Sequence, residues 1–158
     1  MSGLKQSFVT KLTDVNSVAQ EPLGSIRIEG TKTYKYVELK NTTATVTAVA
    51  GTLVAYNAAT GYANSKVVSD LTDADAVPIC AGAMCGTIAG VLATPYFGWL
   101  QTRGACTLDT AVTTGAAGKG WTLTTTDKTA TVAVAGDTGP YGGVSLDGTT
   151  SVLLNCPM

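Results

Sequence analysis

Short runs of residues that alternate between two faces recur along the 158-residue chain, and turn residues separate them. The clearest run covers residues 33–40, where Tyr34 and Tyr36 share one face. The opposite face takes Lys35, Val37 and Leu39. This period of two, with aromatic and β-branched side chains, is the pattern of a β-strand. The alternation therefore predicts a fold that is built from strands.

Similar runs follow at the spacing expected of a sandwich or barrel, and they predict about ten short strands. They cover residues 45–49, 52–56, 66–69, 97–104, 121–124, 130–134, 143–146 and 151–155. Asp147-Gly148 between the last two runs predicts a hairpin, and Gly104 predicts a turn after its run. Because no linker divides the runs, we expect a single-domain antiparallel β-barrel or β-sandwich over residues 23–158.

Residues 1–22 form a polar N-terminal arm that ends at Pro22. Its apolar residues are spaced by three to four, which favours a short helix, and an extended arm lying on a neighbour is an equal alternative. The arm has no apolar core of signal-peptide length, and Asp14 comes early. We therefore expect the chain to be made in the cytoplasm of its host cell, without export through a signal peptide.

The chain is poor in charge, with 45% hydrophobic and 13% charged residues. Such a composition argues against disorder and favours a surface that is partly covered by partners, because interface centres are depleted of charge. Ten basic residues nearly balance eleven acidic ones, so there is no basic field to bind nucleic acid. No Lys/Arg cluster indicates a membrane surface either.

Residues 79–100 contain no charge and are long enough to span a bilayer. Gly82, Gly86 and Gly90 also fit the small-residue spacing of packed membrane helices. However, the run is rich in glycine, holds Pro95 and lacks a basic flank. We therefore prefer a buried β segment with glycine kinks, and we expect no membrane association.

The residues needed for common catalytic sites are missing or badly spaced. The chain has no histidine, which excludes Ser-His-Asp and Cys-His catalysis and mixed zinc sites. Only Cys80 and Cys85 are close among the four cysteines, and we expect free thiols in an intracellular protein. Residues 115–120 lack the spacing of a phosphate loop. The sequence therefore predicts a protein that is not an enzyme and binds no cofactor or metal.

Two further groups have a structural and a functional interpretation. Asp70, Asp73 and Asp75 lack the spacing of a calcium loop, so a solvated acidic turn is the preferred interpretation. Aromatic residues can form a sugar platform or an interface, but in a strand they normally pack in a core. We assign Trp99 to the core and leave Trp121 open between these interpretations.

Three stretches together resemble the decoration, or cement, proteins of tailed-phage capsids. They are residues 23–39 with the Tyr34-Lys35-Tyr36 strand, residues 81–104 with their glycines and aromatics, and residues 141–155 with the closing hairpin. The resemblance covers most of residues 23–155. It implies a small β-barrel or sandwich on the outside of an icosahedral head, where it bridges neighbouring major capsid subunits against internal DNA pressure.

The resemblance also implies a virion location, a homo-oligomer such as a trimer, and a terminal arm held by the capsid. Residues 1–22 are the candidate arm, and its candidate contacts with the major capsid protein are Leu4, Lys5, Phe8, Lys11 and Leu12. The alternative function is a carbohydrate- or receptor-binding β module of a phage tail fibre, with Trp121 or Tyr62 as an exposed stacking platform. The physics agrees with the first function, because extended arms and strand edges recognise protein surfaces through main-chain pairing.

Overall fold

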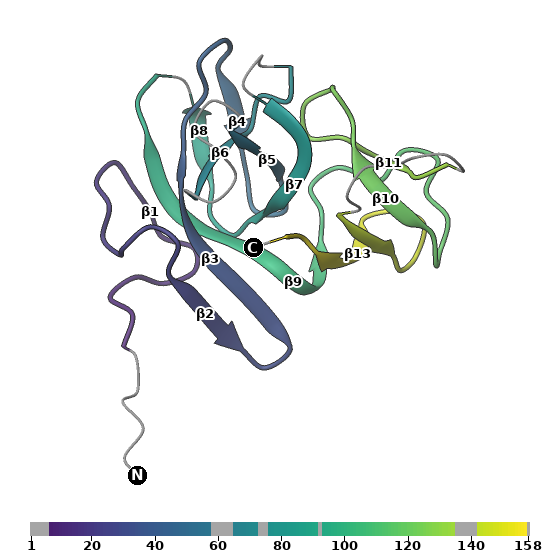
Figure 1. The fold of residues 1–158 in the computed structure, drawn as a ribbon, viewed down its shortest axis with the longest axis horizontal. Helices are drawn as coiled ribbons and strands as arrows, with labels where there is room; N and C mark the ends of the chain where they lie inside the picture. Colours follow the sequence, from purple (N-terminus) through teal and green to yellow (C-terminus); the bar gives the residue numbers. More distant parts are fainter. Residues whose placement is uncertain (1–6, 58–64, 73–75, 92, 135–141, 158) are drawn as a thin grey trace.

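The computed structural model describes residues 7–57, 65–72, 76–91, 93–134 and 142–157. Within these ranges it contains thirteen strands and no helix (Figure 1), which confirms the all-β, single-domain prediction. The strands are β1 (Val15–Asn16), β2 (Ile26–Glu29), β3 (Lys32–Leu39), β4 (Val46–Ala48), β5 (Leu53–Asn57), β6 (Lys66–Val68), β7 (Ala76–Met84), β8 (Ile88–Val91), β9 (Tyr96–Thr107), β10 (Gly120–Leu123), β11 (Ala130–Val132), β12 (Gly143–Ser145) and β13 (Ser151–Asn155).

Five strands close into a small barrel in the order β3-β9-β7-β5-β6 and back to β3. Four of these pairings are antiparallel, while β6 closes the ring by pairing in parallel with β3 through Glu38 and Lys66. Closure removes the free edges that an open sheet would expose. The short β4–β8 pair adds Ala48 and Ile88 to the barrel core.

The twelve-residue strand β9 joins this barrel to the rest of the fold (Figure 1). One edge of β9 pairs with β3 from Tyr96 to Arg103. The other edge pairs in turn with β1, β7 and β13. From β13 a second layer continues through β12 and β10 to β11. The predicted turn after Gly104 is wrong, because Gly104 adopts a φ of +94° inside the strand and lets the strand continue to Thr107.

Three apolar clusters hold the fold together. The barrel interior contains Leu100 together with Val37 and Leu39, which the alternation of residues 33–40 places on one face. A second cluster fills the space between the barrel wall and the second layer, around Trp121. The third lies on the opposite side of β3 and β9, where Tyr34, Tyr36 and Trp99 pack together. Each face of these two strands is therefore covered by apolar packing.

Most of the described part of the charge-free run of residues 79–100 lies in strands β7, β8 and β9, which confirms the β interpretation. Gly82, with a φ of +151°, lies where a Cβ atom would come within 2.6 Å of the Gln101 carbonyl oxygen. This glycine therefore permits the close approach of β7 to β9. Among the residues described here, no helix is long and apolar enough to cross a membrane.

The predicted hairpin at Asp147-Gly148 joins β12 to β13. The Asp147 carboxylate accepts hydrogen bonds from the backbone N–H groups of Thr149 and Ser151, at 2.7 and 3.2 Å. These donors stabilise the ionised form and lower the pKa of Asp147 to about 2. Gly148 takes the left-handed conformation that completes the turn.

We expect Gly104→Ala to destabilise the protein by about 2–4 kcal/mol, from left-handed strain and crowding. The new Cβ atom would lie 2.8 Å from the Thr31 carbonyl oxygen. Gly118→Ala is the matched control, because Gly118 has a similar φ of +78° and an added Cβ would meet nothing within 4 Å. Urea unfolding measures both variants, and equal losses would show that the approach of Thr31 does not matter.

Candidate interaction surface

The outer face of the second layer is a charge-poor surface, and the strand register places four residues in one row across it. Ala105 of β9 pairs with Leu153 of β13, Leu153 pairs with Val144 of β12, and Val144 pairs with Gly120 of β10. Because successive side chains point to opposite faces, the neighbouring Leu154 points into the core. We call this surface, with Leu146 beside it, the outer face.

Apolar side chains on the outer face are exposed to solvent. Leu153 is 45% exposed, Leu146 is 49% exposed and Val144 is 37% exposed. Single exposed apolar residues are ordinary, but a group on one sheet face is typical of an interaction site. These residues therefore make the outer face a candidate protein-binding surface.

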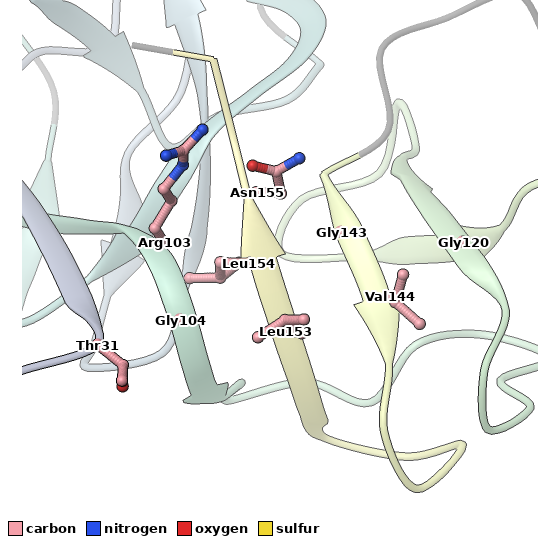
Figure 2. Close-up of a pocket in the computed structure, with 9 residues that line it drawn as sticks. All are labelled: Thr31, Arg103, Gly104, Gly120, Gly143, Val144, Leu153, Leu154 and Asn155. Atoms are coloured by element: carbon pink, nitrogen blue, oxygen red, sulfur yellow. The ribbon is translucent and has the colours of Figure 1, made fainter.

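A groove of about 490 Å³ runs over this face (Figure 2). Figure 2 shows β9, β13, β12 and β10 side by side beneath it, with Thr31 of the β2–β3 turn on the β9 side. Among the described residues that line the groove, Arg103 is the one with a charged side chain. Glycines at 104, 120 and 143 keep the floor of the groove low, since they add no side chain.

The described part of the predicted arm packs on the chain's own body. Phe8 contacts Trp99 edge-on, with ring centroids 5.1 Å apart, and Trp99 Nε1 donates a 2.9 Å hydrogen bond to Thr10 Oγ1. Val15 in β1 pairs with Gly98 of β9. Residues 7–22 contain no helix, so the short-helix alternative is wrong for this part. Instead the segment follows a path of bends and turns, with the Asp14 N–H donating to the Lys11 carbonyl oxygen at 3.1 Å, and only Val15–Asn16 forms a strand.

The five predicted capsid contacts have different environments. Leu4 and Lys5 lie outside the described residues. Phe8 and Leu12 are half-buried against the Trp99 cluster, and Lys11 is exposed. The structure brings Phe8 and Leu12 together but points them toward the body of the chain. A role for these five residues in binding a partner, and the arm boundary at residue 22, stay predictions.

Both tryptophans are buried. Trp99 lies in the core as predicted, and Trp121 is 0% exposed in the cluster between barrel and second layer. A buried indole cannot stack on a sugar, so Trp121 is excluded as the platform of a carbohydrate site. Its Nε1 has no hydrogen-bond partner among the described residues. Tyr62, the other suggested platform, lies outside them.

The acidic turn differs from its prediction. Asp70 is fully buried and accepts hydrogen bonds from the Ala44 N–H at 3.0 Å and from the Thr72 hydroxyl at 2.6 Å. The solvated turn is therefore wrong for Asp70, whose carboxylate satisfies local backbone and side-chain donors. Asp73 and Asp75 lie outside the described residues. The described residues hold no group of three or more potential metal ligands.

Sequence reasoning missed the outer face. The runs at residues 143–146 and 151–155 predict strands, but the apolar Val144 and Leu146 share the face that the structure exposes, and residues 151–155 carry apolar side chains on both faces. Leu153 and Leu154 therefore look equivalent until the packing of the sheet on the barrel is known. No protein-family model, curated protein or solved structure matches the chain.

We expect Phe8→Ala to destabilise the protein by about 1–3 kcal/mol, because it removes the edge-on contact with Trp99. Lys11→Ala is the matched control in the same segment and should leave the free energy of unfolding within about 0.5 kcal/mol. Thermal unfolding followed by tryptophan fluorescence measures both. Equal stability of the two variants would show that the segment does not pack as described.

We expect the protein to lose stability at alkaline pH because the Cys85 thiol has a raised pKa in the folded state. Burial, with a smaller effect of nearby Cys106, raises the pKa of Cys85 from 9.0 to about 12. Between these values the unfolded chain loses this proton and the folded chain keeps it, so the contribution is present below pH 9 and is lost above it. Urea unfolding measures the effect. Between pH 8 and pH 10 we expect the free energy of unfolding of the parent to fall by about 1 kcal/mol more than that of Cys85→Ala. Parallel pH profiles would contradict this.

Proposed function

We propose that this protein is a virion structural protein that binds the outer surface of a tailed-phage head and bridges subunits of the major capsid protein. The observation that carries the proposal is the charge-poor outer face with exposed Leu153, Leu146 and Val144. The class of partner follows from the sequence resemblance to capsid decoration proteins. In this function the chain acts by binding and needs no catalytic step.

The outer face has the properties of a surface that binds another protein. Its exposed side chains are apolar, and burying them against a partner is favourable at about 25 cal/mol for each Å² removed from water. Arg103 and Asn155 stand at one end of the groove and provide polar groups for a rim. An apolar centre with a polar rim is the usual anatomy of a protein interface.

The barrel and its packed core hold the outer face in a fixed conformation. The face shares β9 with the closed barrel, and the cluster around Trp121 fills the space between them. A surface that is already ordered loses little conformational entropy on binding. In the proposed function, many such copies on one shell strengthen it through multivalency, and assembly as a trimer would link three outer faces.

The first test is the copy number of the chain in purified virions of the phage that encodes it. We expect quantitative mass spectrometry to find about one copy per major capsid subunit, because the proposed site repeats with the lattice. A few copies for each virion would favour a tail or fibre location. Absence from the virion would contradict the proposal.

The second test uses Leu153→Glu, which places a charge at the centre of the outer face. We expect it to weaken co-sedimentation with heads that lack the protein by tenfold or more, because burying an unpaired carboxylate is costly. Ile28→Glu is the matched control, since Ile28 is 71% exposed on β2 outside the groove. Both variants should unfold at the parental temperature. Loss of binding in Ile28→Glu alone would place the contact elsewhere.

A further inference from the structure

Cys80 and Cys156 meet in the core although 76 positions separate them in the sequence. Cys80 lies in barrel strand β7, and Cys156 directly follows β13 of the second layer. Their Sγ atoms are 3.3 Å apart, and the two residues are 1% and 3% exposed. No other pair of thiols in the described residues has an Sγ–Sγ contact of this kind.

The residues around Cys156 are held in place by several hydrogen bonds. The Cys156 N–H donates to the Thr102 carbonyl oxygen at 3.0 Å, and Cys156 Sγ lies 3.5 Å from the Gly142 carbonyl oxygen. The next residue is fixed as well, because the Tyr56 hydroxyl donates a 2.7 Å hydrogen bond to the Pro157 carbonyl oxygen. Cys80 is held on the other side of the contact by the pairing of β7 with β5, in which it lies opposite Ala55.

We propose that Cys80 and Cys156 are a latent cross-link, reduced when the chain is made and joined by a disulfide under oxidising conditions. A small-molecule disulfide such as oxidised glutathione is the oxidant. One cysteine thiolate attacks it and releases one thiol, and the second cysteine then attacks the mixed disulfide and releases the other. The two cysteines lose two protons and two electrons, and the oxidant becomes two thiols.

The cross-link would act where the two parts of the fold meet. It joins the barrel wall to the last strand of the chain, and both cysteines belong to the cluster that fills this junction. Closing so long a loop restricts the unfolded chain and raises the stability of the folded state. The link is independent of the proposed function, since it follows from the position of two sulfur atoms.

Burial controls the rate of this reaction. The hydrogen bond to Cys80, together with desolvation, raises the pKa of Cys156 well above its usual value. Since the thiolate is the attacking form, we expect the folded protein to oxidise slowly and selectively, over hours rather than seconds. Cys85 and Cys106, which line a separate cavity of about 480 Å³, are only half-buried and form the competing pair.

The experiment incubates the reduced, purified chain with oxidised glutathione and maps the disulfides by peptide mass spectrometry without reduction. The expected product is the Cys80–Cys156 cross-linked peptide, with an increase in the melting temperature of about 5–15 °C. The double variant C85S/C106S is the matched control, and its melting temperature should rise by the same amount on oxidation. Reduction should reverse the increase.

Two results would overturn the proposal. The first is a map that shows Cys85–Cys106, or only glutathione adducts, after complete reaction of the parent. The second is a Cys80–Cys156 link without any rise in melting temperature. The variant Cys156→Ser should show no rise on oxidation, and peptide mapping of the parent decides the question even where this variant folds poorly.

Discussion

The backbone hydrogen bonds along both edges of β9 are the interaction on which the rest of the structure depends. One edge holds β3 and so forms the barrel wall, while the other holds β1, β7 and β13 in sequence. Several strands and turns of the same chain approach β9 closely. Gly82 and Gly104 therefore lie where a Cβ atom would meet a neighbouring carbonyl oxygen. The barrel, the N-terminal segment and the outer face are therefore positioned by a single strand.

Much of the fold could be predicted from local patterns. The alternation of residues 33–40 places Val37 and Leu39 on one face, as in the structure, and the Asp147-Gly148 dipeptide marks a real hairpin. The parallel pairing of β3 with β6 could not be predicted, because it depends on contacts between distant segments and leaves no local pattern. The turn expected at Gly104 failed for a related reason. A glycine supplies the same backbone freedom to a turn and to a bend within a strand.

The candidate site was less accessible to sequence reasoning. Phe8 and Leu12 follow a spacing that indicates an apolar contact, but the spacing does not say whether the contact is with a partner or with Trp99 of the same chain. Leu153 could be assigned to a strand but not to a face. Trp121 is one of the largest buried side chains, and the alternation of its strand places it on one face with Leu123, but this pattern does not say whether that apolar face meets the core or a ligand. Tertiary packing decides each of these cases.

The pairing of β3 also has a consequence for biosynthesis. Tyr36 pairs with Trp99, so the barrel cannot close before residues 96–107 have left the ribosome. Until then β3 can pair only with β2 and, through Glu38 and Leu39, with β6, and the long edge that β9 will occupy stays open. Folds with such long-range pairings mature in milliseconds to seconds and are exposed to aggregation while they wait. The nascent β3 therefore has to be protected until β9 has emerged, and strands made late in synthesis complete a core begun by earlier ones.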